Sequence, residues 1–208
     1  TLTIAEGGTL DYYWPAVDAD NRTFSSGTTQ VTNGGTITGA GYLVDFRSST
    51  NATLVNNGTM TATSSSRALY INNSDNTTIT NTGTIQISAS NAYEVIDGDS
   101  TTDLTITNSG TISSAGDDAI AIASAEDVTI TNSGTIYATG NVAIDGVSFS
   151  GSRDVALGNV TISNATNVSL GGGFSDNGTG NGIDGNLIMT GISDTVTLNA
   201  TSGSSYLI

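Results

Sequence analysis

The residues of this chain best able to do chemistry are carboxylates. Asp117 and Asp118 are adjacent, and paired carboxylates can serve glycoside hydrolysis as general acid and base. Because hydrolysis needs more than an aspartate pair, we favour the simpler interpretation of an exposed acidic turn. Asp97, Asp99 and Asp103 could hold calcium through hard oxygen ligands, or could be solubilising acids in turns. Calcium is the only cofactor that we expect the composition to favour.

The composition excludes most other chemistry. Among 208 residues there are 19 acidic and 4 basic ones, a net charge of -15, and the sequence contains no lysine, histidine or cysteine. Zinc, copper, haem and iron–sulfur sites therefore lack their usual ligands. Cysteine nucleophiles and Ser-His-Asp triads are impossible within the chain. The negative charge repels nucleic acid, and without a long apolar run we expect no membrane insertion by this segment.

The elements that must position these acids belong to an internal repeat. The phrase Asn-x-Gly-Thr-Ile, exact or degenerate, recurs at intervals of 23 to 32 residues, with anchors at positions 6, 33, 56, 81, 108, 132, 164 and 191. Such a period is typical of solenoids, in which each unit buries its apolar face against its neighbours.

Each repeat unit predicts three short strands. One ends just before the anchor, one follows the turn, and the third is an apolar run 10–14 residues further on, such as residues 93–96. Apolar residues alternate with threonine, so one face points inward. We therefore expect an all-β fold, a right-handed parallel β-helix of about eight coils.

The anchor residues predict structural ladders between coils. The glycines at 8, 35, 58, 83, 110 and 134 are expected to form the tight turn, with a positive φ angle. The anchor asparagines are expected to stack, each amide bonding the next as in cross-β assemblies. These asparagines are Asn33, Asn56, Asn81, Asn108, Asn132 and Asn164.

We expect residues 1–208 to form a single β-helix domain with two special regions. Residues 1–32 form an N-terminal capping coil, and residues 171–182 form a glycine-rich loop insertion. Tyr12, Tyr13 and Trp14 either close the N-terminal end of the core or bind a sugar or partner. Phe174 lies in the inserted loop, a kind of segment that often carries binding on solenoids.

Two family resemblances follow from these motifs. The phrase Thr-Ile-Thr-Asn-Ser-Gly-Thr-Ile at 105–112 and 129–136 resembles the passenger domains of bacterial autotransporters and related surface adhesins. That resemblance implies a β-helix outside the cell. We expect no counterpart in this chain of the translocating outer-membrane barrel that is typical of the family. The segment 115–122 is similar to part of the polygalacturonases, but their remaining motifs require histidine and lysine, which are absent here.

We therefore expect a non-enzymatic, structural or adhesive module that is secreted or lies on the bacterial cell surface. Its partners would be other copies of the protein, or glycans or proteins of a host or cell surface. An alternative is a self-assembling subunit of an extracellular filament or surface layer, which would form a homo-oligomer through its bare strand edges. Regular Thr-x-Thr files also leave open an ice-binding protein, and Asp117 with Asp118 a polysaccharide-degrading enzyme.

Overall fold

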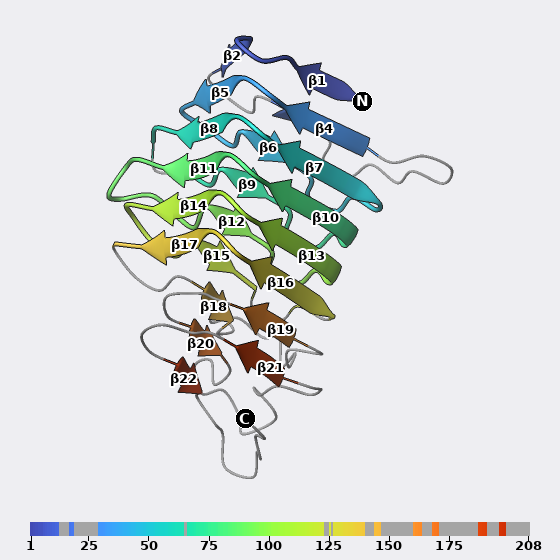
Figure 1. Cartoon of the computed structure of the whole chain (residues 1–208), viewed down its shortest axis with the longest axis vertical. Coiled ribbons are helices and arrows are strands. Elements are labelled where there is room, and N and C mark those ends of the chain that lie inside the picture. Colours follow the sequence, from blue (N-terminus) through green and yellow to red (C-terminus); the bar gives the residue numbers. More distant parts are fainter. Residues whose placement is uncertain are drawn as a thin grey trace.

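The computed structural model describes residues 1–12, 17–18, 29–64, 66–122, 125, 127–139, 144–146, 160–163, 168–170, 187–190 and 196–198. All regular elements in these ranges are β-strands, arranged in three parallel sheets around one axis (Figure 1). The chain passes through the three sheets in the same order in each coil, and crossovers between parallel strands are expected to be right-handed. The predicted parallel β-helix is thus confirmed.

Sheet A is formed by the strand that precedes each asparagine turn. Its strands, in spatial order, are β1 (Leu2–Ile4), β4 (Thr29–Asn33), β7 (Ala52–Asn56), β10 (Asp75–Asn81), β13 (Thr102–Asn108), β16 (Val128–Asn132), β19 (Val160–Ser163) and β21 (Leu187–Thr190). Sheet B follows the turn and contains β2 (Thr9–Tyr12), β5 (Thr36–Gly39), β8 (Thr59–Ala62), β11 (Thr84–Ile87), β14 (Thr111–Ser114) and β17 (Thr135–Ala138).

Sheet C consists of very short strands. They are β3 (Val17–Asp18), β6 (Val44–Asp45), β9 (Leu69–Tyr70), β12 (Ile96–Asp97), β15 (Ile120–Ala121), β18 (Ile144–Gly146), β20 (Val168–Leu170) and β22 (Val196–Leu198). From β1 to β16 the chain completes about five full turns, which differs from the eight predicted coils. Beyond β18, two strands each in sheets A and C are described, and β17 is the last described strand of sheet B.

The core lies inside the three sheets and consists of apolar ladders. Equivalent residues of successive coils pair in register, as Ile79 does with Ile106 and Ile106 with Ile130. Their side chains are 0% exposed, and each buried isoleucine contributes roughly 1.5–3 kcal/mol to folding. Sheets B and C repeat the pattern through Ile85 and Ile96, both also 0% exposed.

The predicted positive φ of the anchor glycines is wrong. Among the described glycines only Gly7 has a positive φ, 74°. The glycines are required instead because consecutive coils approach closely at this corner: a Cβ at Gly83 would lie 1.9 Å from the carbonyl oxygen of Gly58. Left-handed backbone occurs where the chain enters sheet A, with φ of 52–59°. Asn51 and Asp127 directly precede β7 and β16, and Asn76 and Asp103 are the second residues of β10 and β13.

Candidate functional site

A row of tyrosine and arginine side chains runs along the solenoid axis beside sheet C. Tyr70 lies in β9, and the chain places Tyr42 and Arg47 around β6, Arg67 just before β9 and Tyr93 before β12. We call these five residues the tyrosine–arginine strip. They come from three successive coils, since Val44 pairs with Leu69 and Leu69 with Ile96.

The strip is a chain of contacts between rings and guanidinium groups, in which the rings of Tyr42 and Tyr70 also contact each other, with centroids 4.8 Å apart. The guanidinium carbon of Arg47 lies 5.6 Å from the ring centroid of Tyr42 and 4.6 Å from that of Tyr70. That of Arg67 lies 4.8 Å from the Tyr70 ring and 4.7 Å from the Tyr93 ring. These distances are those of cation–π contacts. The ring of Tyr70 therefore contacts both arginines and the ring of Tyr42.

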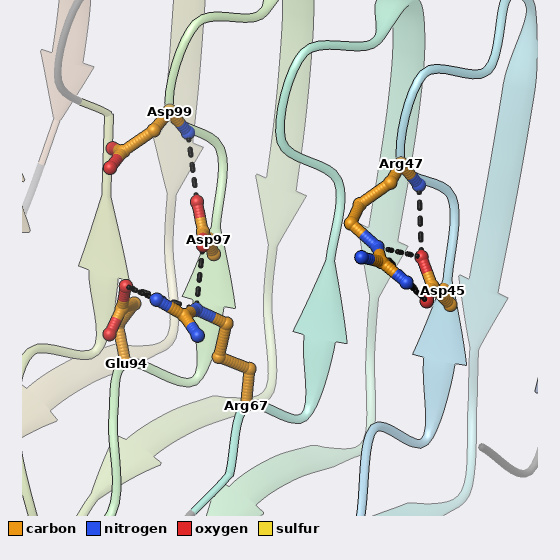
Figure 2. Close-up of polar contacts among 6 residues, drawn as sticks. All are labelled: Asp45, Arg47, Arg67, Glu94, Asp97 and Asp99. Atoms are coloured by element: carbon orange, nitrogen blue, oxygen red, sulfur yellow. Dashed lines mark hydrogen bonds and ion pairs between the residues drawn. The ribbon is translucent and has the colours of Figure 1, made fainter. Parts of the chain in front are cut away.

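Carboxylates fix both guanidinium groups (Figure 2). Asp45 accepts two bonds from Nε of Arg47 and one of 2.7 Å from its Nη2. Arg67 donates from Nη2 to Oε1 of Glu94 at 3.0 Å, and its Nε lies 2.6 Å from Oδ2 of Asp97. Such charge-assisted pairs hold the planar guanidinium groups in one orientation.

The acid side of the strip is buried and carries more charge than the arginine it faces. Asp97 and Glu94 are 2% and 4% exposed, and they share the single charge of Arg67. Burial raises the pKa of Asp97 to about 6, with Glu94 adding to the rise and Arg67 opposing it. Burial lowers the pKa of Arg67, but Asp97 and Glu94 outweigh that effect and raise it. Burial and Asp97 also raise the pKa of Tyr70.

The three predicted calcium ligands are not brought together. The carboxylate of Asp97 is directed to Arg67, and its Oδ1 accepts a bond of 3.2 Å from the backbone N–H of Asp99. Asp103 is exposed and has a left-handed backbone at the second residue of β13. No group of three or more potential metal ligands occurs among the residues that the structure describes.

Of the predicted asparagines, five form one unbroken ladder at the corner between sheets A and B. Nδ2 of Asn33, Asn56, Asn81 and Asn108 each donates to Oδ1 of the next asparagine, at 2.7–2.8 Å, ending at Asn132. Every one of the five is at most 1% exposed. Each of the four donors also bonds a threonine carbonyl of the next coil, as Asn81 does with Thr111 at 3.1 Å. The ladder therefore ties coils together and has no surface on which to bind a ligand.

The remaining predicted residues lie elsewhere. Asp118 is buried, at 1% exposure, and Asp117 is half-buried. The backbone N–H of Asp117 donates to the carbonyl oxygen of Ala92 on the preceding coil at 3.1 Å. The pair is therefore not the fully exposed acidic turn that we expected. The backbone of Tyr12 belongs to β2. The structure describes none of Tyr13, Trp14, Phe174, Asn164 or the loop 171–182.

Sequence reasoning did not find the strip. From the sequence, residues 93–96 are predicted as a third strand, but Tyr93 is not connected with Tyr42 and Tyr70. The signal was present, because the three tyrosines recur at intervals of 28 and 23 residues, within the range of the repeat. The arginines occupy different positions in their coils, so no periodicity marks them.

The parallel β-solenoid fold, the acidic and lysine-free composition and the tyrosine–arginine strip together define the class of the protein. It is a repeat scaffold that presents long faces. A family model described as the BigA fourth domain matches residues 17–174, about three quarters of the chain. The chain therefore belongs to the BigA fourth-domain family. This family indicates a bacterial surface, adhesin-like protein. No curated protein and no solved structure matches the chain.

Proposed function

We propose that this chain is a non-enzymatic, extracellular spacer and adhesive module that binds its partner along the side of the solenoid. The observation that carries the proposal is the tyrosine–arginine strip. It concentrates on one face both described arginines and three of the seven tyrosines. Tyrosine and arginine are the residues enriched at the energetic centres of protein interfaces.

The fold supports such a role because it makes the face rigid. Tyr42, Tyr70 and Tyr93 are held at fixed spacing by backbone pairing between coils and by stacked arginines. A preorganised surface loses little conformational entropy when a partner binds. An autotransporter-like passenger domain, exported and displayed at the cell surface, would use the face in this way.

We also propose that the chain has no catalytic activity and requires no cofactor. It is supported by the composition, which lacks histidine, lysine and cysteine, and by the paired state of Asp97. A catalytic Asp117 and Asp118 would release reducing ends from polyuronate, so an assay of reducing sugar with the unaltered chain tests this part directly.

Adhesion itself is tested with beads coated with the purified chain. We expect them to attach to cultured host cells or to cells of the source bacterium more than beads coated with albumin. The variant Tyr93→Ser should lower attachment by at least half. Tyr137→Ser is the matched control, since Tyr137 is a similarly exposed tyrosine on sheet B (39% against 52%). Equal attachment by albumin beads would contradict the proposal.

A second candidate is self-assembly through the N-terminal end of the solenoid. Leu2 is 38% exposed, and Ile4, Leu10 and Val17 pack against the core but are only partly buried. Strands β1, β2 and β3 are the outermost strands of their sheets, so backbone groups are directed away from the solenoid. A second copy could add to this end. Negative-stain electron microscopy with calcium and with chelator tests it: filaments support assembly, and isolated rods in both buffers contradict it.

A further inference from the structure

Tyr42 and Tyr70 bring two phenol rings into direct contact across successive coils. Their ring centroids lie 4.8 Å apart and the ring planes are tilted by 51°, within the range of favourable aromatic pairs. Both side chains are half-buried, so the rings pack against the solenoid and still reach solvent. Two phenols in contact at an accessible surface are the reactants of one particular covalent reaction, the oxidative coupling of tyrosines.

The structure around the pair holds the two rings in place. The backbone N–H of Phe46 donates to the carbonyl oxygen of Tyr70 at 2.8 Å, which fixes the coil of Tyr42 against the next one. The guanidinium of Arg47 contacts both rings and is itself held by Asp45. Reacting groups that are held together in this way couple with each other in preference to groups on other molecules.

The composition of the chain gives this reaction a structural purpose. Without cysteine and lysine, the chain can form neither a disulfide nor a lysine-based isopeptide bond. Consecutive coils are therefore joined by hydrogen bonds and apolar packing, as they are at the asparagine ladder. A bond between two tyrosines would add a covalent tie between coils that this composition permits.

We propose that Tyr42 and Tyr70 form an oxidative cross-linking site, at which hydrogen peroxide and a haem peroxidase join the two rings as dityrosine. Each phenol gives up one electron and one proton and becomes a phenoxyl radical. The two radicals form a carbon–carbon bond between ring positions next to the hydroxyl-bearing carbons. Each bonded carbon then loses its hydrogen as a proton, and each oxygen takes one up. The two electrons and two protons released overall reduce one peroxide to two water molecules.

Folding must precede this cross-link. The two tyrosines are 28 residues apart in the sequence, and it is the stacking of β6 on β9 that brings them together. The unfolded chain is therefore not trapped by the reaction. Once formed, the bond closes a loop and restricts the unfolded state, as a disulfide does. The inference does not depend on the adhesive function, because it concerns how one solenoid is held together.

The arginines of the chain make the cross-link simple to detect. Trypsin cleaves after arginine, so Tyr42 is released in the peptide 23–47 and Tyr70 in the peptide 68–153. The dilute whole chain is treated with peroxide and peroxidase, denatured in urea and digested, and the peptides are analysed by mass spectrometry. We expect these two peptides to be joined with the loss of two hydrogen atoms. The joined fraction should not depend on protein concentration, and the treated chain should unfold at a higher urea concentration.

Phenylalanine variants identify the residues that react, because they keep the ring and remove the phenol oxygen. Tyr42→Phe and Tyr70→Phe should each abolish the joined peptides, whereas Tyr93→Phe, on the same strip, should leave them unchanged. Circular dichroism verifies that the variants are folded.

Three results would overturn the inference. One is the absence of joined peptides under conditions in which free tyrosine is coupled. Another is a cross-link that persists in Tyr70→Phe, or that joins the peptide 23–47 to the peptide 1–22, which contains Tyr12 and Tyr13. The third is coupling that occurs only between molecules, seen as covalent dimers whose yield rises with protein concentration.

Discussion

Replacing Gly83 by alanine tests whether close packing of coils, rather than backbone freedom, is what requires glycine at the anchor. The added Cβ would lie 1.9 Å from the carbonyl oxygen of Gly58, where ordinary contact begins at 3.4 Å. The atom it meets is backbone, so the two coils must separate. The bonds at risk are Thr84 N–H to Gly58 O at 2.8 Å and Asn56 Nδ2 to Asn81 Oδ1 at 2.7 Å.

The expected cost of Gly83→Ala is large. Losing two or three hydrogen bonds costs about 1 kcal/mol each, and leaving the buried amide of Asn56 unsatisfied adds about 1–3 kcal/mol, so we expect a loss of about 4 kcal/mol in the free energy of unfolding. Urea unfolding followed by circular dichroism measures it, with amide hydrogen exchange at Thr84 as the local readout.

The matched control for this prediction is Gly7→Ala. Gly7 has a φ of 74°, and a Cβ there would meet nothing within 4 Å, so only the backbone penalty of about 1 kcal/mol applies. If Gly83→Ala lowers the urea midpoint no more than Gly7→Ala, the close-packing argument is refuted.

Three further predictions concern the ladder and the strip. Asn81→Asp replaces a buried amide that donates to Asn108 with a carboxylate that cannot donate, so urea unfolding should show a loss above about 2 kcal/mol, whereas Asn57→Asp at an exposed position should cost little. Because the folded chain holds the Asp97 proton more tightly than the unfolded chain, with a pKa of about 6 against 3.8, this group should lower stability by up to roughly 3 kcal/mol as pH rises from about 4 through 6. Asp97→Asn should remove that fall. If the free energy of unfolding of the variant depends on pH as that of the unaltered chain does, the prediction is wrong. Tyr70→Leu removes two cation–π contacts and should lower the free energy of unfolding by about 1–2 kcal/mol, while Tyr70→Phe should lower it far less.

The fold could be predicted because its determinants repeat. Alternation of isoleucine and threonine in segments such as 129–131 sets the inward face, and the recurrence of Asn-x-Gly sets the register from coil to coil. The spacing of equivalent residues then follows from strand geometry alone. About five complete turns are described against eight predicted coils. A recurring phrase marks a strand of sheet A and does not by itself establish the other two strands of a coil.

The site could not be predicted in the same way because its residues do not share a position. Arg47 follows its strand of sheet C, whereas Arg67 precedes its strand, yet both guanidinium groups contact the same ring. Only the long arginine side chains make that convergence possible. The partner of Asp97 could not be predicted for the same reason, since the sequence does not reveal that Arg67 reaches its carboxylate.

Sheet C differs from the asparagine corner in how much the residues at equivalent positions vary from coil to coil. At the asparagine position five successive described coils carry the same side chain, because each amide must bond the next. One register position of sheet C carries Asp45, Tyr70, Asp97 and Ala121 in four successive coils. Neighbouring coils can differ there because the backbone hydrogen bonds between the strands do not depend on which side chains they carry. A surface that is chemically varied on a fixed lattice is suited to recognition, and this supports the proposal that the interaction surface lies beside sheet C.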